Sequence, residues 1–338
     1  MDAIALAKEL VLLETPTGHE GPAVAFLGDL LGRLGYRTVR QPVTPGRDNL
    51  YAWRETPEVV FSTHLDCVPP YLPLREDATY LHGRGTCDAK GLAAAMVCAA
   101  ERLAASGERR VGLLFVVGEE NGSDGAQIAN ELGPRGRYLI NGEPTENRLS
   151  LGQKGSLKIV LESEGRAAHS AYPDEGRSAL LPILDTLERL RRLPLPEDPM
   201  LGRGSLNVGV LRGGVAPNVI PASARGELLM RLVGPSAALR QQIAACAEPT
   251  VTVTFPTELP YYKNTAPAPA GWTTTVVGYA SDLPFYDAWG DRFQLGPGSI
   301  RVAHTSEERI AKAELLEGVQ LYVRLAKELI ATRLTPDA

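Results

Sequence analysis

Hydrophobic and polar positions along the first 150 residues follow two alternating patterns. Apolar residues at helical spacing predict helices over 3–14 and 20–35, and an alanine-rich run predicts another over 89–106. The apolar runs between these helices predict strands over 37–41, 48–53, 58–64, 111–120 and 137–144. Short apolar strands that alternate with helices are typical of an α/β domain with a mostly parallel central sheet flanked by helices.

The pattern changes near residue 152 and changes back after residue 260. Between these points polar and apolar residues alternate in GSLKIVLESEGRA and ARGELLMRLVG, as in an antiparallel sheet with one face in water. The middle segment is also predicted to contain helices over 177–193 and 236–247 and a strand over 250–255. After it, the sequence predicts helices over 271–281 and 309–332 and a strand over 292–295. The middle segment therefore reads as a small α+β domain of the ferredoxin-like kind.

The order of these elements predicts one domain inserted into another. We expect an α/β domain built from residues 1–153 and 258–338, interrupted by the α+β domain over 154–257. A chain of 338 residues is long enough for two such domains. The connections between them are expected near 152–155 and 256–263.

Composition and charge exclude some classes of function. The chain is 44% hydrophobic and 22% charged, which are ordinary values for a globular protein, and its formal net charge is -5. A nucleic-acid groove or a polybasic membrane surface would need clustered lysine and arginine, which an acidic chain disfavours. No run approaches the roughly 18 consecutive apolar residues of a membrane-spanning helix. We therefore expect neither nucleic acid nor a membrane as a partner.

The N-terminal segment and the cysteines bear on the cellular compartment. The segment MDAIALAKELVLLETPTGHEG has no basic start and no small-residue cleavage site, so no signal peptide is expected. The four cysteines form no CxxC pair, which favours neither a zinc ribbon nor a disulfide framework. Free thiols are typical of a reducing compartment, and a cytoplasmic location is the expectation.

Polar side chains follow several predicted strands, at the edge where an open α/β sheet binds its ligands. His64 and Asp66 leave the strand in VVFSTHLDCVPP, and alternate residues of a strand share a face. The other candidates, each beside a strand end or a helix start, are Asp88, Glu119, Glu120, Glu143 and His304. Each has an ordinary alternative as a solvated strand end, a helix cap, a turn residue or an exposed loop residue. If every residue had its ordinary role, the acidic groups would have to gather at one edge of the sheet by chance. The combined pattern therefore favours a functional site.

The types of these residues indicate a kind of metal site. Two histidines with three or more carboxylates, and no cysteine pair, are typical of catalytic zinc or cobalt rather than structural zinc. Two such ions can polarise a carbonyl and activate water, and a carboxylate outside the ligand set can act as general base. The expected cofactors are therefore two divalent ions, Zn²⁺ or Co²⁺.

Five segments that carry these residues resemble one known family. HLDCVP, GRGTCDAKG, GEENGSDGA, NGEPT and AHTSEE, in this order, resemble the M20 family of metallo-aminoacylases and peptidases. The resemblance spans nearly the whole chain, including the middle segment. It implies a catalytic α/β domain interrupted by a lid domain that commonly mediates dimerisation, so a homodimer is expected.

The resemblance also implies a role for each candidate. Asp88 would bridge the two metals, with His64 and Glu143 on one metal and Glu120 and His304 on the other. Glu119 would be the general base. Asp66 would hold the His64 imidazole in its ligating tautomer.

The middle segment and the glycine-rich LGPGS carry further expectations from the family. GRAAHSAYPDEGRSA resembles the lid histidine motif of the family, so His169 should stabilise the tetrahedral oxyanion. In relatives this histidine reaches into the active site of the partner subunit. In GGVAPNVIPASARGELLMRL, Asn218 and Arg231 would meet the substrate, with the arginine suited to a carboxylate. The backbone N–H groups of Gly296 and Gly298 would be available to a substrate carboxylate.

The segment QLGPGSIRVAHTSEERI looks most like the lysine-biosynthesis branch of the family. Such enzymes release lysine or ornithine from an N-blocked precursor, in which the block is acetyl or the C-terminal glutamate of an acidic carrier protein of the LysW type. This segment departs from that branch at two positions, because Ser299 and Ala303 stand where acidic residues are expected. The expected substrate is therefore a small N-acyl amino acid or a carrier-linked one, in amino-acid biosynthesis.

Other readings remain open beside this one. The same fold would serve a succinyl-diaminopimelate desuccinylase, a dipeptidase or a carboxypeptidase. A noncatalytic amino-acid or peptide binding homologue would have lost Glu119 or a metal ligand, and none is lost. A serine hydrolase is disfavoured because no G-x-S-x-G segment occurs, and the spacing of GRGTCDAKG matches neither nucleotide-binding motif.

Overall fold

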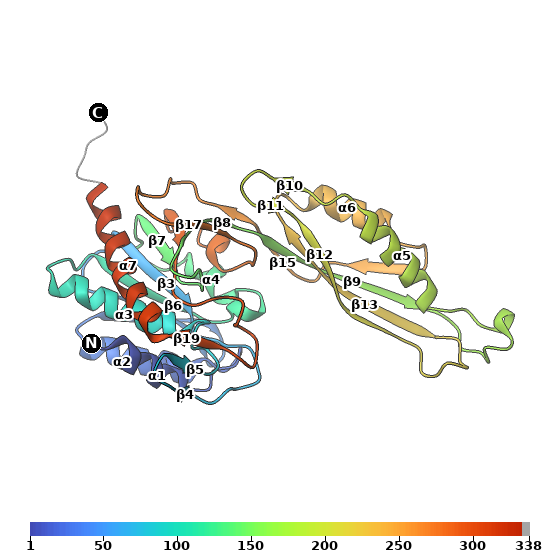
Figure 1. The fold of residues 1–338 in the computed structure, drawn as a ribbon, viewed down its shortest axis with the longest axis horizontal. Coiled ribbons are helices and arrows are strands. Elements are labelled where there is room, and N and C mark those ends of the chain that lie inside the picture. The colour runs from blue at the N-terminus through green and yellow to red at the C-terminus, as the bar shows by residue number, and fades with distance from the viewer. Residues whose placement is uncertain (333–338) are drawn as a thin grey trace. The chain divides into compact units, whose positions relative to one another are not determined.

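The computed structural model describes residues 1–332 of the chain, and these form two compact units (Figure 1). The first unit contains Met1–Gly152, Lys263–Val276 and the described residues from Ser281 onward. The second contains Gln153–Tyr262 and Val277–Ala280. Each unit has its own hydrophobic core.

The first unit is an α/β structure around one large sheet. Its helices are α1 (Ala3–Val11), α2 (Gly21–Arg33), α3 (Lys90–Ala105), α4 (Asp124–Ala129) and α7 (Lys312–Ala331), with short 3-10 turns η1 (Glu119–Asn121) and η3 (Leu283–Phe285). The strands of the large sheet are β1 (Arg37–Thr44), β2 (Arg47–Trp53), β3 (Val59–His64), β6 (Val111–Val116), β7 (Tyr138–Asn141), β8 (Leu149–Gln153), β16 (Tyr262–Lys263), β17 (Thr274–Val277) and β18 (Asp291–Gln294). A smaller sheet contains β4 (Arg75–Glu76), β5 (Tyr80–His82) and β19 (Arg309–Ala311).

The large sheet has the order β1-β2-β6-β3-β7-β18-β8-β16, and β17 also pairs with β8. Strands β6, β3, β7 and β18 run parallel to one another, whereas β1, β2 and β8 pair antiparallel. The predicted α/β fold is confirmed, with a mixed sheet that is parallel only at its centre. Every residue of β3 and β6 is buried, as expected for central parallel strands covered on both faces.

Helix α3 lies among α1, α7 and the central strands. Its residues are buried continuously from Lys90 to Ala100, so no face of this stretch is left to water. Alanine and glycine let neighbouring elements approach the helix closely from several directions, which explains the composition of the run. The helix begins at Lys90, two residues after Asp88, which therefore lies in the turn before its first residue.

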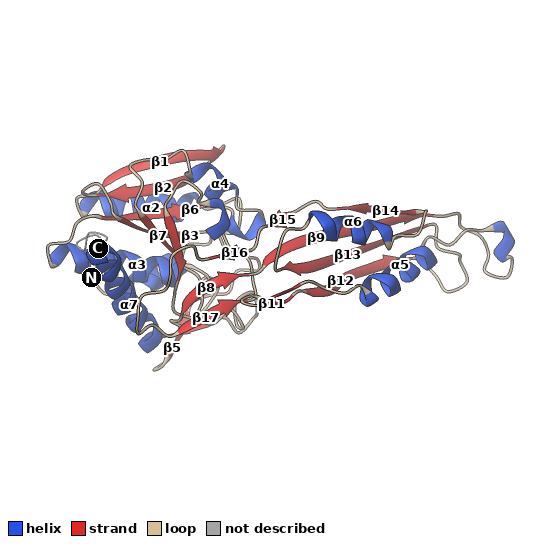
Figure 2. Ribbon diagram, turned by 90° about the horizontal axis from the view of Figure 1, so that it is seen from above, coloured by secondary structure: helices blue, strands red, loops and turns tan. Residues whose placement is uncertain are grey.

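The second unit is an α+β structure. Its antiparallel sheet contains β9 (Gly155–Glu164), β12 (Ser205–Gly213), β13 (Ser223–Leu232), β14 (Val251–Thr254) and β15 (Glu258–Leu259), in the order β12-β13-β9-β14 with β15 also on β9. The remaining elements are α5 (Leu180–Arg192), α6 (Ala237–Ala245), the hairpin β10 (Glu197–Asp198) and β11 (Gly202–Arg203), and the 3-10 turn η2 (Pro173–Glu175). Both helices cover one face of the sheet (Figure 2). Residues along β13 alternate between buried and more exposed.

The structure corrects two local predictions. The helix expected over 271–281 is wrong, because the run Thr273–Val277 contains the strand β17. Its threonines and valines are β-branched, which disfavours a helix and suits a strand. The connection expected over 152–155 does contain the boundary between the two units, but it is nearly all strand, since only Lys154 separates β8 from β9.

No described helix combines the length and the apolar character needed to cross a membrane. The six residues after Thr332 lie outside the described part of the chain, and they include the end of the predicted 258–338 segment.

Candidate metal centre

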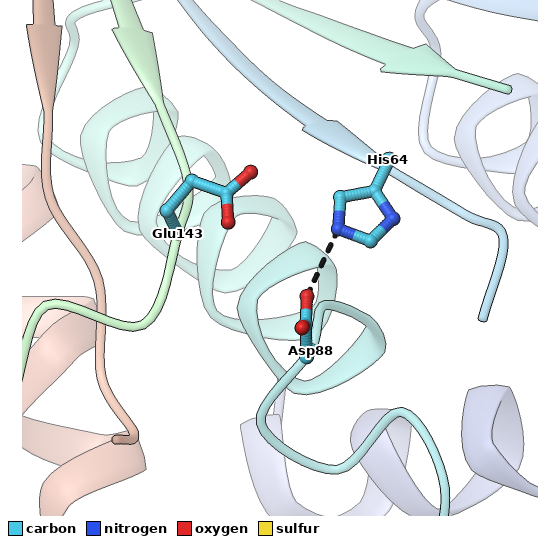
Figure 3. A group of neighbouring side chains, drawn as sticks. All are labelled: His64, Asp88 and Glu143. Atoms are coloured by element: carbon cyan, nitrogen blue, oxygen red, sulfur yellow. Dashed lines mark hydrogen bonds and ion pairs between the residues drawn. The ribbon is translucent and has the colours of Figure 1, made fainter. Parts of the chain in front are cut away.

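The predicted ligands come from the carboxyl ends of neighbouring parallel strands and from two loops beside them. His64 is the last residue of β3, Glu119 and Glu120 begin η1 after β6, and Glu143 follows β7. Because β6, β3 and β7 are adjacent and parallel, their carboxyl ends meet at one edge. Figure 3 shows His64, Asp88 and Glu143 converging there, with Asp88 at the turn before α3.

The carboxylate of Asp88 lies between two imidazoles. Its Oδ1 is 3.0 Å from His64 Nε2, and its Oδ2 is 3.2 Å from His304 Nε2. His304 Nε2 also lies 2.9 Å from Glu120 Oε1. Asp88 is 5% exposed, so both of its oxygens are used inside the protein.

Among residues 1–332, three overlapping groups of side chains could hold a metal ion, and the ligand atoms within each group all lie within 4.8 Å of one another. One group contains His64, Asp88 and Glu143, and a second contains Asp88, Glu120 and His304. These two groups share Asp88, as the family resemblance implies for a bridging ligand. The third group joins His64 with Glu119 and Glu120, so Glu119 lies close to the same positions.

Asp66 connects His64 to the turn that carries Glu119 and Glu120. His64 Nδ1 lies 3.4 Å from Asp66 Oδ1 and 3.0 Å from the Asp66 backbone oxygen. The Asp66 carboxylate also accepts hydrogen bonds from the backbone N–H groups of Glu119 and Glu120, at 3.2 and 3.1 Å, and from Thr17 Oγ1 at 2.8 Å. Burial raises the pKa of Asp66, but hydrogen bonds led by the one with His64 outweigh burial and lower it. An ionised Asp66 keeps a proton on His64 Nδ1 and leaves Nε2 facing Asp88.

Several buried carboxyl groups gather at this edge beside only two imidazoles. Burial raises the pKa of Glu119 well above its usual range, and the nearby charge of Glu143 adds to this shift. Burial likewise raises the pKa of Glu143 and, more moderately, that of Glu120. Buried carboxylates held close together are costly unless cations neutralise them. The donors are imidazole nitrogens and carboxylate oxygens, a set that fits two divalent ions of the zinc or cobalt type.

The same cluster holds protons when it binds no ion. Hydrogen bonds to Asp88 and Glu120 raise the pKa of His304 to about 10. The pKa of His64 is also raised, because hydrogen bonds to Asp66 and Asp88 outweigh the opposing effect of burial. Protons on the two imidazoles therefore compete with a metal ion for the same nitrogen atoms. A metal must displace these protons, so its affinity rises with pH through the neutral range.

The predicted lid residues lie at opposite ends of β13. His169 forms a bridge with Val219, and the backbone N–H of Ser170 donates to the backbone oxygen of Asn218 at 3.0 Å. Both segments precede Ser223, the first residue of β13. Arg231 is near the other end of the strand, and ten residues of strand span about 30 Å. The structure therefore brings His169 and Asn218 together but not Asn218 and Arg231.

The structure disagrees with the role expected for the glycine-rich loop. The N–H of Gly296 donates to Thr145 Oγ1 at 3.0 Å, and that of Gly298 donates to Glu314 Oε1 at 2.9 Å. Neither N–H is therefore available to a substrate carboxylate. These glycines instead permit close packing, because a Cβ at Gly296 would lie 2.5 Å from the backbone oxygen of Glu143. At Gly298, where φ is +92°, a Cβ would lie 2.7 Å from Cys87 Cβ.

Sequence reasoning missed several residues that surround the site. Thr17 holds Asp66, and the buried carboxylate of Glu308 accepts hydrogen bonds from Arg84 and from the loop before Asp88. Glu308 stands in AHTSEE, a segment interpreted only for its histidine. Asp282 is 1% exposed, and its Oδ1 has no hydrogen-bond partner among the described residues. No local pattern distinguishes these acids from surface acids, because their partners come from distant segments.

Comparisons with known proteins agree with this architecture. A model of peptidase family M20/M25/M40 matches residues 60–328. The chain is 37% identical over 365 residues to a protein of Aspergillus clavatus named a probable carboxypeptidase, covering 95% of this chain and 81% of the relative.

Solved structures that share the fold include the following two. One is a tripeptidase from Staphylococcus aureus, with a TM-score of 0.78 at 22% identity, covering 96% of this chain and 98% of the other. The second is described as a dinuclear metal binding peptidase of the M20 family from Bacillus subtilis, with a TM-score of 0.69 at 14% identity and 98% coverage of both chains. At these identities the two structures bear on the fold alone.

Proposed function

The chain belongs to peptidase family M20/M25/M40, and on this premise we propose that it is a dinuclear-metal exopeptidase that cleaves short peptides beside a free carboxylate. The position of Asp88 carries this proposal. Its two carboxylate oxygens lie 3.0 Å from His64 Nε2 and 3.2 Å from His304 Nε2. A carboxylate between two imidazoles is the arrangement needed to join two adjacent metal positions.

In this proposal the five predicted ligands are divided between two positions. His64 and Glu143 would hold one divalent ion, Glu120 and His304 would hold the other, and Asp88 would contact both. Zn²⁺ or Co²⁺ fits these donors. Such ions, when bound, supply positive charge for the substrate carbonyl and make water more acidic.

Glu119 would serve as the general base. Its carboxylate would take a proton from the attacking water while the new C–O bond forms. The same proton would pass to the amine nitrogen as the C–N bond breaks. The hydrogen bond from the Glu119 backbone N–H to Asp66 supports this role, because it fixes the turn on which the carboxylate is carried.

His169 would stabilise the oxyanion of the tetrahedral intermediate. Its Nδ1 accepts a hydrogen bond from the backbone N–H of Ala171 at 3.1 Å. A neutral imidazole whose Nδ1 accepts must carry its proton on Nε2, where it can donate to developing negative charge.

The surface of the second unit has features that suit a homodimer interface. Strand β12 is at an edge of the five-stranded sheet, and Val208 and Leu211 on it are 38% and 42% exposed. On α5, Leu181 and Leu184 are 61% and 41% exposed. An open strand edge beside exposed apolar side chains favours pairing with another copy. We propose that His169 and Asn218 act in the site of the partner subunit, while Arg231 acts in its own chain.

A mixing experiment tests the contribution from the partner subunit. The His169→Ala and Glu119→Ala homodimers are each expected to be nearly inactive. After subunit exchange, about a quarter of the wild-type activity should return, since half of the dimers are mixed and one of their two sites is complete. Mixing Asp88→Ala with Glu119→Ala is the control, because both changes damage the site of their own chain. Proven exchange without recovery in the first mixture would mean that each site is built from one chain.

The comparisons support the peptidase alternative better than the principal sequence prediction of an N-acyl-lysine or N-acyl-ornithine hydrolase in biosynthesis. The relative from Aspergillus clavatus is named a probable carboxypeptidase, and the family model that matches residues 60–328 is that of a peptidase family. Arg231 is consistent with this choice. Burial lowers its pKa, and its side chain has no hydrogen bond or ion pair with any described residue. A half-buried guanidinium without an acceptor suits the carboxylate of a substrate.

A substrate panel tests the reaction. Zinc- or cobalt-loaded protein would be assayed for amine release from dipeptides and tripeptides, each with its C-terminal amide as the matched control. We expect the free acids to be cleaved at least about 100-fold faster than the amides, because an amide leaves Arg231 unpaired. The panel also contains N-acetyl-lysine, N-acetylornithine, succinyl-diaminopimelate and γ-glutamyl-lysine on a carrier-protein tail. Preference for one of these would overturn the peptidase assignment and return the protein to a biosynthetic branch.

A further inference from the structure

Glu308 is a buried acid that the reaction described above does not use. It is 1% exposed and follows His304 by four residues in the same loop. Its Oε2 accepts a hydrogen bond from Arg84 Nη1 at 2.5 Å, and Arg84 is itself only 4% exposed. A buried carboxylate paired with a buried guanidinium is strongly held in one orientation.

The other oxygen of Glu308 collects backbone donors from a distant loop. Glu308 Oε1 accepts hydrogen bonds from the N–H groups of Gly85, Cys87 and Asp88, at 2.8, 3.3 and 3.3 Å. Three backbone N–H groups from one short stretch converge on this oxygen, and such convergent donors bind a carboxylate well. Gly85 makes this turn possible, because its φ is +85° and a Cβ there would lie 2.8 Å from Cys67 Sγ.

The small sheet explains why these two loops meet. Strand β19 pairs antiparallel with β5, so that Arg309 lies opposite His82. The loop that precedes β19 and the loop that follows β5 therefore leave the ladder at the same end. The backbone N–H of Gly83 extends the ladder by donating to the backbone oxygen of Glu308 at 3.0 Å. The Glu308 side chain then accepts hydrogen bonds from the loop that follows β5, between Gly85 and Asp88.

This contact joins the loops of two ligands of the same metal position, Asp88 and His304, whereas at the other position Asp88 keeps its direct contact with His64. His64 is held separately, by strand β3 and by Asp66. The distance between Asp88 and His304, in contrast, depends on how their two loops are joined. We propose that Glu308 is a positioning residue that fixes the Asp88 loop to the His304 loop and thereby sets the metal affinity of the position formed by Asp88, Glu120 and His304. This proposal rests on the proposed dinuclear function.

A cobalt titration of the full-length, metal-free protein tests the proposal. Binding of Co²⁺ would be followed by calorimetry and visible absorption, and His304→Ala would identify the binding step that belongs to the His304 position. Glu308→Ala is expected to weaken that step by about 10- to 100-fold and the other step by less than about threefold. Glu307→Ala is the matched control, since it removes the same charge from the exposed neighbouring residue and should change neither step.

Several results would overturn the proposal. One is a Glu308→Ala protein with both steps unchanged, and another is an equal loss in both steps, which would indicate a general structural role. If the Glu308→Ala protein does not fold, the same cobalt titration of Glu308→Gln tests the proposal. Glutamine keeps an acceptor for the N–H groups but loses the charged pair, so about a threefold or greater loss in the His304 step is expected. A Glu308→Gln protein that binds cobalt like wild type would count against the proposal.

The titration also separates this proposal from the proposed function. Wild-type protein that binds cobalt in two steps but cleaves no peptide would refute the peptidase function alone. Wild-type protein that binds no cobalt would refute both.

Discussion

Replacement of Glu119 by glutamine is expected to lower kcat by about 10³-fold or more while both metals remain bound, because general-base catalysis contributes about 10²–10⁴-fold. Glutamine has nearly the same shape but cannot accept the proton of the attacking water. The backbone N–H of residue 119 would still donate to Asp66, so the turn should keep its geometry. The loss should appear mainly in kcat, since Glu119 acts on the water and leaves substrate binding unaffected.

Two measurements must be read together for this variant. Metal content per chain is needed because Glu119 lies in one of the groups that could hold an ion. Loss of about one metal per chain would make Glu119 a ligand instead of the base. Glu131→Gln is the control, because it makes the same glutamate-to-glutamine substitution at an exposed residue outside the site. Activity within about tenfold of wild type, with both metals bound, would remove Glu119 from the proposed role.

Replacement of Asp88 by alanine is expected to have the largest effect of any single substitution in the site. Asp88 is the only residue common to the two candidate groups that contain Glu143 and His304. Its removal should weaken both metal positions and reduce peptide cleavage to background. His304→Ala, by comparison, should weaken only one position, because His64 and Glu143 remain. The difference in the number of bound metal ions between Asp88→Ala and His304→Ala shows whether Asp88 contributes to both metal positions.

Equilibrium dialysis against zinc or cobalt, followed by metal analysis, checks this prediction. We expect two ions per chain for wild type, about one for His304→Ala and less than one for Asp88→Ala. Circular dichroism should show that Asp88→Ala remains folded. An Asp88→Ala protein that retains two tightly bound ions would contradict the bridging role, and the proposed division of ligands would have to be redrawn.

Elements with strong local patterns were the easiest to predict from the sequence. The helix α3 and the strands β3 and β6 are long apolar runs whose residues are buried nearly throughout. Burial of this kind leaves a clear pattern in one sequence. The segment that contains β17 is harder to predict, because its apolar residues follow neither the helical nor the strand period decisively. Its pairing with β8, a strand more than 100 residues earlier, is what holds it extended.

The sequence by itself determined which chemical groups are present and which of them stand at strand ends. His64, Glu119 and Glu143 could be picked out because a strand presents its next residues to one edge of the sheet. Only the tertiary structure decided how these groups are used. It placed Asp88 between two imidazoles, gave Asp66 three further donors, and assigned the N–H groups of the glycine-rich loop to acceptors within the protein.

The reason for this division is physical. A hydrogen bond or a shared ligand depends on distances of a few ångströms between segments that are far apart in the chain. Glu308 and Gly85, for example, are separated by 223 positions and meet only because β5 and β19 pair. Residue type and local period follow from neighbouring positions, whereas the partner of a buried charge follows from the packing of the whole unit.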